Sequence, residues 1–386
     1  MTEDAGTSAR ARVTRLVLQD FRSYPGLSVE TDASLVALSG ENGAGKTNLL
    51  EAISLFTPGR GLRRAELAEM ARDACGRFSV FASLRRGLDG EHGLGVGLAG
   101  APGERAMRIC RIDGADAGSP AAFAEYLRLV WLTPDLDGLF RGPAGDRRRF
   151  LDRLVLAVDA AHGARVNALE RATRQRNRLL EDPGADRRWL DAIEREIAEV
   201  AIAVAAARRE TVERLGGLIT RERDDASPFP FAALSLDGEV DALVSGAAAV
   251  DAEDSYRRTL RDFRARDAGA GRTLFGPQSS DLRVRHGPKG IAADTASTGE
   301  QKALLIGLVL AHARLVRAMT GMAPIVLLDE VAAHLDPRRR AALYSALDAL
   351  GGQIWMTGAD PALFEDLPSG ALHLRVEPGA ARPVGG

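Results

Sequence analysis

The sequence has few lysines and few cysteines, and these shortages limit what the protein can be. Lysine occurs only at Lys46, Lys289 and Lys302, although the 386-residue chain has 51 basic residues, so a lysine within a motif is informative. The two cysteines, Cys75 and Cys110, match no metal-ligand spacing and are expected to be small core residues in a reducing compartment. The six histidines show no metal-ligand spacing either. A disulfide-stapled miniature protein is therefore excluded.

Long apolar runs are also missing. Residues 1–16 contain no apolar stretch of the signal-peptide type, and the uncharged stretches 200–207 and 303–311 are far shorter than the ~18 residues of a membrane span. We therefore expect a soluble, cytoplasmic protein. With 45% apolar and 27% charged residues, the composition is that of a globular chain of about two to three domains. The net charge of -2 neither indicates nor excludes a nucleic-acid partner, because a basic patch can be balanced by acids elsewhere.

Hydrophobic periodicity predicts an α/β protein with a helical insertion. We expect buried strands over 13–18 and 35–38, a helix over 48–56, and a strand-rich region over 76–112. Alternating strands and helices return from about 273 to 376. The middle of the chain therefore differs in character from both ends.

The middle of the chain reads as helical from about 146 to 223, and a further helix is expected over 252–266. One apolar stripe has helical spacing: Trp189, Ile193, Ile197, Val200 and Val204. Its expected partner is an earlier helix that carries Leu151, Leu154, Val155, Val166 and Leu169. The pattern is typical of an antiparallel helical arm, and equally of an ordinary helix that faces a core.

A phosphate-binding loop is the strongest single motif. Residues 40–47 fit the pattern GxxxxGK[ST] between an expected strand and an expected helix, which is the context that the motif requires. Glycines let backbone N–H groups surround phosphate oxygens, Lys46 can reach the β- and γ-phosphates, and the Thr47 hydroxyl can bind Mg²⁺. A glycine-rich turn without a ligand is the alternative. The predicted nucleotide-binding residues are Gly40, Glu41, Asn42, Gly43, Ala44, Gly45, Lys46, Thr47 and Asn48.

Two adjacent acids, Asp329 and Glu330, follow the apolar run 325–328, which is typical of a buried parallel strand. Buried acids are unfavourable unless a cation or another partner uses them. We therefore predict that Asp329 and Thr47 hold Mg²⁺ and that Glu330 orients or deprotonates the attacking water, with Lys46 as the second catalytic group. A solvated pair of acids at a strand end is the alternative.

A capping-box sequence, Ser297 to Gln301, precedes an apolar helix about 30 residues before Asp329. Asp336 follows the acids, just before Pro337, where it is also a good helix N-cap. The order of these motifs resembles that of the ATP-binding-cassette class: the loop, then the capping box, then the two acids, then Asp336. The resemblance implies a head-to-tail dimer with ATP between subunits, in which Asp336 forms the D-loop and a trans signature is formed by Ser297, Thr298, Gly299, Glu300 and Gln301.

Further segments are similar to the RecF family of bacterial recombination and repair proteins, which are ABC/SMC-like ATPases. These segments are residues 15–24, 45–53, 59–63, 134–152, 175–177, 276–277 and 281–282. The resemblance implies an α/β fold with an ABC-type P-loop ATPase head in two parts, residues 1–140 and 269–386, and an inserted helical arm over 141–268. It also implies an ATP-dependent DNA-binding protein of recombinational repair and replication-fork maintenance that works with RecR and RecO in recombinase loading.

The sequence departs from this pattern at three places. The family's Gly-Pro-His-Arg is Gly-Pro-Gln-Ser at 276–279, no glutamine lies between Asn48 and Arg174, and Thr357-Gly358 stand where a switch histidine is expected. These departures predict ATP used as a slow clamp, with weak, DNA-stimulated hydrolysis for release.

The predicted DNA contacts are arginines. Residues 141–180 hold ten arginines against four acids, a local balance of +6 in a chain of net charge -2. The few aromatic residues among them favour backbone contact over base stacking. A solvated helix face is the alternative. The expected partner is duplex DNA, gapped DNA or a single-strand/double-strand junction. The candidate contacts are Arg60, Arg63, Arg64, Arg147, Arg148 and Arg149.

Two other functions stay open from the residues. A transporter cassette would need a surface for a membrane partner. A DNA scaffold with an inactive nucleotide site is opposed by the intact Lys46, Thr47, Asp329 and Glu330. A long chromosome-organising coiled coil is excluded, because an arm of ~130 residues folded back on itself at ~1.5 Å per residue has too little reach.

Overall fold

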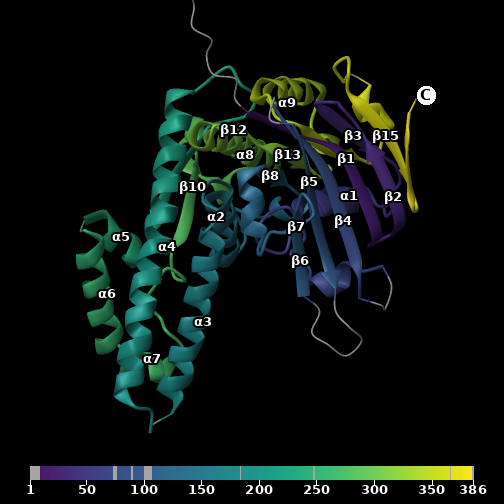
Figure 1. Ribbon diagram of the computed structural model, residues 1–386. Coiled ribbons are helices and arrows are strands. Elements are labelled where there is room, and N and C mark those ends of the chain that lie inside the picture. The colour runs from purple at the N-terminus through teal and green to yellow at the C-terminus, as the bar shows by residue number, and fades with distance from the viewer. Residues whose placement is uncertain are drawn as a thin grey trace, which may run out of the picture. The chain divides into compact units, whose positions relative to one another are not determined.

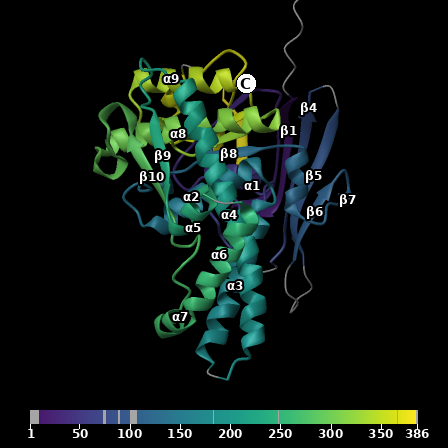
Figure 2. The same cartoon turned by 90° about the vertical axis from the view of Figure 1, so that its left-hand side faces the viewer.

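The computed structural model describes most of the chain as two units (Figures 1 and 2). The first unit comprises Met1–Asp137, Asp225–Phe229 and Leu305–Gly386, and the second comprises Gly138–Asp224 and Pro230–Leu304. The described residues are 9–72, 76–87, 90–99, 107–182, 184–246, 248–365 and 367–384. Cys110 is buried in the first unit, whereas Cys75 lies outside the described residues.

A largely antiparallel seven-stranded sheet forms one part of the first unit. The strand-rich region predicted over 76–112 lies in this sheet, and the strand predicted over 13–18 is longer than expected. The strands are β1 (Ala9–Phe21), β2 (Tyr24–Glu30), β4 (Phe78–Arg86), β5 (Glu91–Ala99), β6 (Met107–Ile112), β7 (Ala115–Asp116) and β12 (Met322–Ala323). Alternating burial along β4 fits a sheet with one face on the core and the other in solvent.

A six-stranded sheet forms the other part of the first unit, in the order β16-β15-β3-β14-β13-β8. All of its pairs except β15–β16 are parallel. The strands are β3 (Leu35–Ser39), β8 (Leu129–Leu132), β13 (Ile325–Leu328), β14 (Ile354–Gly358), β15 (Leu372–Glu377) and β16 (Ala380–Pro383). Every residue of β3, β13 and β14 is buried, as continuous apolar runs of central parallel strands require.

Three helices accompany these sheets: α1 (Lys46–Ser54), α8 (Thr298–Thr320), whose first turns belong to the second unit, and α9 (Pro337–Leu350). Leu49, Leu50 and Ile53 of α1 are fully buried in a core that both sheets share. Among the described helices, α8 alone is long and apolar enough to cross a membrane by length and composition, but 67% of its most apolar window is buried within the protein. Such burial is typical of a core helix.

The second unit consists of helices and a three-stranded sheet in the order β11-β10-β9. Its helices are α2 (Ala144–Val158), α3 (His162–Glu181), α4 (Arg187–Arg221), α5 (Glu239–Gly246), α6 (Ala249–Asp262) and α7 (Arg264–Ala270). Its strands are β9 (Ala232–Asp237), β10 (Asp281–His286) and β11 (Ile291–Ala292). The helix predicted over 252–266 is therefore two helices, α6 and α7, which meet at Phe263.

Helices α3 and α4 run side by side in both views and form an antiparallel hairpin (Figures 1 and 2). Ile193, Ile197 and Val204 are buried, as the apolar stripe predicted. Trp189 is 62% exposed, so its place in the stripe was wrong; the neighbouring Leu190 is buried in its stead. Apolar spacing alone could not separate these adjacent residues, because intervals of three and of four residues both place a side chain on the same helix face as Ile193. The predicted partner helix is also two helices, α2 and α3.

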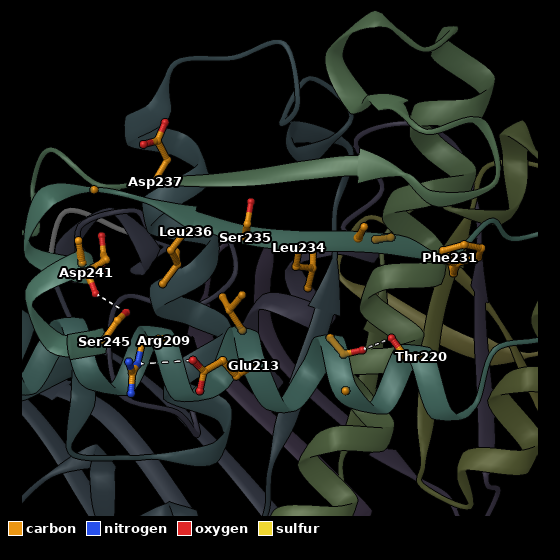
Figure 3. A pocket seen from close by; sticks show the side chains of 17 residues that line it. Arg209, Glu213, Thr220, Phe231, Leu234, Ser235, Leu236, Asp237, Asp241 and Ser245 are labelled. Carbon is orange, nitrogen blue, oxygen red and sulfur yellow. Dashed lines mark hydrogen bonds and ion pairs between the residues drawn. The ribbon is translucent and has the colours of Figure 1, made fainter. Parts of the chain in front are cut away.

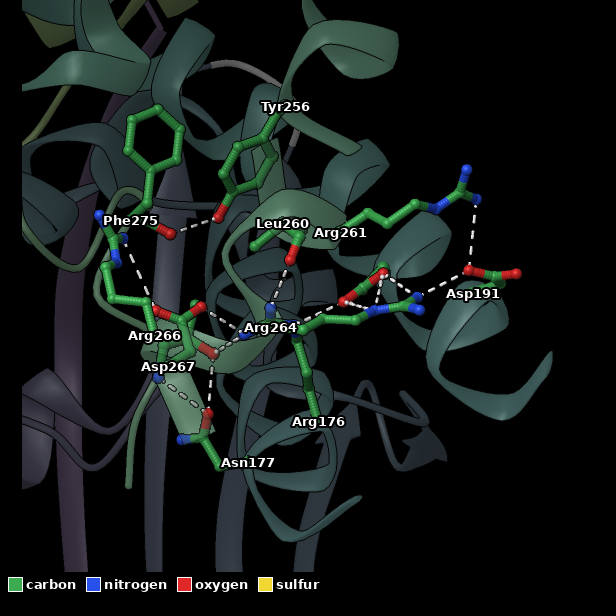
Figure 4. A network of polar contacts seen from close by, with 12 residues as sticks. Arg176, Asn177, Asp191, Tyr256, Leu260, Arg261, Arg264, Arg266, Asp267 and Phe275 are labelled. Atoms are coloured by element: carbon green, nitrogen blue, oxygen red, sulfur yellow. Dashed lines mark hydrogen bonds and ion pairs between the residues drawn. The ribbon is translucent and has the colours of Figure 1, made fainter. Parts of the chain in front are cut away.

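A buried ion network holds the hairpin to α7 (Figure 4). The Arg176 guanidinium is fully buried and donates to Glu194 (3.0 Å) and Asp267 (2.8 Å). Its remaining hydrogen bonds reach Thr273 Oγ1 and the Leu260 carbonyl. Every charged group in such a site needs a partner, because removal from water is unfavourable. Arg176 therefore belongs to the interior, although the sequence analysis counted it in the cationic surface.

We predict that Arg176→Met lowers the free energy of unfolding by about 3–5 kcal/mol, because it leaves the buried Asp267 carboxylate without its close cation and removes one of the two arginines that bind Glu194. Urea unfolding monitored by circular dichroism measures this change. Arg174→Met is the matched control, since Arg174 forms an exposed pair with Glu170 and such pairs contribute about 0–1 kcal/mol. Equal stability of the two variants would contradict the network's role.

Candidate functional site

Three neighbouring strand ends of the first unit bring the candidate site together. β3, β14 and β13 are adjacent and parallel, so their carboxyl ends meet at one edge of the sheet. Ser39 is in register with Gly358, and Leu328 with Met356. The segments that follow these strands therefore start side by side, at the edge where ligands bind in open α/β sheets.

The loop from Gly40 to Gly45 can form only with glycine at particular positions. Gly45 has a φ of 111°, and a Cβ there would lie 2.7 Å from the Tyr24 hydroxyl. Gly40 has a φ of 153°, and a Cβ there would lie 2.3 Å from the Val376 carbonyl oxygen. The backbone thus turns sharply between a buried strand and the N-terminus of α1, which presents N–H groups at the position where phosphate binds in loops of this type.

Lys46 folds back over this loop. Its ammonium donates to the carbonyl oxygens of Gly40 (2.6 Å) and Glu41 (2.9 Å), and the side chain is buried. Burial lowers the pKa of Lys46, while the nearby carboxylates of Glu330 and Asp329 act in the opposite direction. The ammonium is therefore held by the same loop whose N–H groups could surround phosphate oxygens.

The buried carboxylate of Asp329 joins two hydroxyl groups. Its Oδ1 accepts hydrogen bonds from Thr47 Oγ1 (2.9 Å) and from Thr357 Oγ1 (2.7 Å). Burial raises the pKa of Asp329, and these two hydroxyls partly offset that effect. The oxygens of Thr47 and Asp329 thus lie together, and hard oxygen donors of this kind are the ligands that Mg²⁺ prefers.

Thr357 also fixes the next acid. The backbone N–H of Glu330 donates to Thr357 Oγ1 (2.9 Å), and Glu330 adopts a φ of 53°, which non-glycine residues rarely do. In the sequence, Thr357 was notable only because it stands where a histidine was expected. Thr357 lies in β14, which pairs with β13, and this pairing places its hydroxyl beside the two acids. The pairing is known only once the strand order is known.

Glu51 is a second residue that the sequence analysis missed. It lies fully buried in α1, where its carboxylate accepts a bidentate pair from Arg22 (2.8 and 2.7 Å) and one bond from Arg63 (3.2 Å). Arg63 also donates to Asn48 Oδ1 (2.7 Å), and its charge lowers the pKa of Asp329. Glu51 therefore ties the segment after α1 to the phosphate-binding loop.

Of the arginines predicted to contact DNA, three follow α1. Arg63 is 42% exposed despite its pair with Glu51, and Arg60 is exposed and pairs with Glu66 (2.5 Å). Arg64 is also exposed and has a φ of 59°. These side chains remain on the surface of the first unit.

The other three arginines lie in α2 of the second unit, where two of them turn inward. Arg147 is 14% exposed and donates to both carboxylate oxygens of Asp281 (2.7 and 2.9 Å), while Arg148 donates to the Ser280 carbonyl (2.8 Å). Both therefore hold α2 to the start of β10, while they stay partly exposed, and their role as DNA contacts stays a prediction. Arg149 is half exposed and pairs with Asp146.

The predicted signature segment lies in the second unit, and its first residues face solvent. Ser297, Thr298 and Gly299 are exposed at the start of α8. The carboxylate of Glu300 accepts from the backbone N–H (3.0 Å) and hydroxyl (2.8 Å) of Ser297 and pairs with Lys289. Lys289 and these bonds to Ser297 lower the pKa of Glu300 to about 2, so the carboxylate stays charged even in mild acid that protonates an ordinary glutamate.

Hydrogen bonds from Gln301 and Arg141 hold the backbone that precedes this segment. Gln301 is buried, and its side-chain amide donates to the carbonyls of Asp294 (3.2 Å) and Ala296 (2.8 Å). Arg141 donates to the same two carbonyls (3.2 and 3.0 Å). The predicted signature segment thus has exposed first residues above hydrogen-bonded backbone.

In the first unit, Asp336 caps α9 by accepting from the Arg339 N–H (2.9 Å), so its prediction as a helix N-cap is confirmed.

We predict that Thr357→Val lowers the free energy of unfolding by about 1–3 kcal/mol, because it removes one donor to Asp329 and leaves the Glu330 N–H without its acceptor. Thr357→Ser keeps the hydroxyl and should retain most of the stability. Chemical denaturation and hydrogen exchange at the Glu330 amide measure both effects. If the two variants unfolded alike, the hydroxyl would not be the group that holds these acids.

The RecF/RecN/SMC N terminal domain family matches residues 12–368. The chain is 54% identical to the DNA replication and repair protein RecF of Mesorhizobium japonicum, over 97% of this chain and 99% of the relative. It is 52% identical to the proteins of that name from Brucella abortus (96% of each chain) and Rhizobium meliloti (95% of this chain and 97% of the relative).

Solved structures share the fold at lower sequence identity. The recombination mediator protein RecF in the RecFOR pathway, solved with ATPrS, has a TM-score of 0.85 at 19% identity and covers 97% of this chain and 98% of that chain. An Smc head domain from Pyrococcus furiosus has a TM-score of 0.51 at 16% identity, with coverage of 97% and 96%. The predicted fold class, an ATPase head of the ABC/SMC type, is thereby confirmed. With these matches along almost its whole length, the chain belongs to the RecF family of DNA replication and repair proteins.

Proposed function

We propose that the protein binds ATP and Mg²⁺ at the edge formed by β3, β14 and β13. The observation that carries this proposal is the contact of Thr47 Oγ1 with Asp329 Oδ1 beside Lys46. Backbone N–H groups of the loop hold the phosphates, and Lys46 exchanges its two carbonyl contacts for the β- and γ-phosphates. The ATP-bound RecF structures, which share this fold, support the same ligand.

Thr47 and Asp329 are the residues that would hold Mg²⁺. Among the described residues no group of three His, Cys, Asp or Glu side chains gathers, so the remaining metal ligands would be phosphate and water oxygens, as is usual for Mg²⁺. Bound Mg²⁺ supplies charge neutralisation for phosphoryl transfer. Thr357 keeps the Asp329 carboxylate oriented toward Thr47, and Glu330 follows on a backbone that the same hydroxyl fixes.

We assign to Glu330 the orientation or deprotonation of the attacking water. Its fixed backbone supports this role, because a base must be held in place before it can act. The missing glutamine and histidine support slow hydrolysis that releases a clamp rather than driving repeated work. We propose that DNA stimulates this weak activity.

The second subunit would supply the signature. Ser297, Thr298 and Gly299 are exposed on the base built by Gln301 and Arg141, so the signature is available to another molecule. In the proposed head-to-tail dimer these residues, with Glu300 and Gln301 behind them, close on the γ-phosphate held by the partner copy, and Asp336 lies at the same junction.

ATP-driven dimerisation would clamp duplex or gapped DNA in support of repair, replication-fork maintenance and recombinase loading. Contact with the DNA phosphate backbone is supported by three exposed arginines, Arg60, Arg63 and Arg64. This contact would lie close to the nucleotide site, since Arg63 is hydrogen-bonded to Asn48 and Glu51. Membership of the RecF family supports RecR and RecO as partners and action in the cytoplasm. A DNA scaffold with an inactive site is the remaining alternative, and turnover that Glu330→Gln abolishes would exclude it.

A mixing experiment tests the shared site. Lys46→Ala removes the phosphate ligand and Ser297→Arg blocks the signature, so each variant alone should lose ATP-dependent DNA binding. A mixture can form a dimer with one site that combines intact Lys46 of one copy with intact Ser297 of the other. We predict that the mixture recovers binding that neither variant has, measured by fluorescence anisotropy on a gapped duplex with Mg²⁺ and ATP.

The controls separate folding from function. Both variants should stay folded without nucleotide in thermal unfolding, since the hydrogen bonds of the Lys46 ammonium reach carbonyls of its own loop and Ser297 is exposed. Variants that bind DNA with ATP as well as the wild-type protein would contradict the proposal. A mixture that stays as inactive as its components would contradict a site shared between subunits.

A further inference from the structure

A cavity of about 820 Å³ lies within the second unit, between α4 and β9 (Figure 3). It follows β9 from Phe231 to Asp237 and ends at α5, where Asp241 and Ser245 line it. Leu234 and Leu236 point from the strand toward α4, and Ser235 points the other way. The volume is in the range of ligand-binding cavities.

Two glycines open the helical wall of this cavity. Gly216 and Gly217 lie side by side inside the 35-residue helix α4, and both line the cavity. A Cβ at either position would meet nothing within 4 Å. Glycine in a helix interior lowers helix stability relative to alanine, and no neighbour here requires its small size. The pair therefore keeps open space beside β9 at the expense of helix stability.

The strand that faces this space is an edge strand. In the described part of the chain β9 pairs with β10 alone. Gly287 N–H donates to the Phe231 carbonyl (2.9 Å), which makes 231/287 a hydrogen-bonded pair of the antiparallel ladder. By alternation, the N–H and C=O groups of Leu234 and Leu236 point away from β10, and no hydrogen bond from the described residues reaches them. Such an edge is a template for one more strand.

One charge in the cavity wall has no ionic partner among the described residues. Arg209 pairs with Glu213 (3.6 Å), and Asp237 pairs with Arg283 (2.8 Å). Asp241 is 4% exposed, the Ser280 hydroxyl lies beside its carboxylate, and no cationic side chain of the described residues forms an ion pair with it. Nearby Arg208 is already bound to Asp152 through two bonds of 2.8 Å. A buried carboxylate of this kind favours a cation at the α5 end of the cavity.

We propose that this cavity binds an extended segment of a partner protein, which adds as a strand to the free edge of β9 and places a lysine or arginine near Asp241. Six residues of β9 at about 3.3 Å each accommodate a segment of similar length. Leu234, Leu236, Val212 and Phe231 receive its apolar side chains, and Gly216 and Gly217 leave room for its backbone. The excess of one negative charge is what selects a basic segment over an acidic one.

The test is a selection from a displayed library of random twelve-residue peptides, performed on the full-length protein without nucleotide. Gly216→Leu fills the cavity without a clash, because the space around the Cβ is open, and leucine is a better helix former. Gly269→Leu is the matched control, since Gly269 is also helical with open space but lies outside the cavity wall. Thermal unfolding should show both variants folded.

We expect the wild-type protein and Gly269→Leu to enrich peptides with alternating apolar residues and a lysine or arginine near one end. Gly216→Leu should enrich none of them. Asp241→Asn should bind the same peptides about tenfold more weakly, and replacing their basic residue with norleucine should have no further effect on that variant. Bound peptide should slow hydrogen exchange at the Leu234 and Leu236 amides.

Three results would overturn the proposal: no enrichment, enrichment that Gly216→Leu leaves unchanged, or unprotected Leu234 and Leu236 amides in the complex. Self-association of the wild-type protein that Gly216→Leu abolishes, without peptide binding, would instead identify a second copy of the chain as the occupant. None of these outcomes involves the nucleotide site, so the proposal stands or falls separately from ATP binding.

Discussion

The candidate site depends on one buried carboxylate. Asp329 accepts the hydroxyls of Thr47 and Thr357, and so joins the ends of three adjacent segments that are far apart in the sequence. A carboxylate this deeply buried requires such donors, and the parallel strands β14 and β3, which lie on one side of β13, supply them. A displacement of the loop, of the two acids or of the end of β14 would therefore displace the other two as well.

Local patterns in the sequence were sufficient for the parts of this arrangement that are themselves local. The phosphate-binding loop has fixed glycine positions, the acids follow a continuous apolar run, and Asp336 before a proline caps a helix, so each could be read within about ten residues. The ABC/SMC type of head followed from the order of these motifs. Helix ends were less certain, because one apolar stripe fits two short helices, such as α6 and α7, as well as one long helix.

Long-range partners could not be read in this way. Arg147 finds Asp281 across 134 positions, and Arg176 finds Asp267 across 91, so a count of arginines between 141 and 180 treated interior ion pairs as surface charge. Thr357 was invisible for the same reason, because its importance comes from the strand that lies beside it. In an arginine-rich protein, charge along the sequence predicts a nucleic-acid surface only after the buried pairs have been removed.

The central claim is that nucleotide bound at this edge closes two copies on one another through the exposed signature. The most direct measurement is the mass of the particle in solution with Mg²⁺ alone, with ADP and with ATP, each with and without a gapped duplex, using Glu330→Gln to hold any closed state. The account predicts a dimer with ATP only, strengthened by DNA. A monomer under every condition would contradict it, because the signature would then have no partner phosphate on which to close.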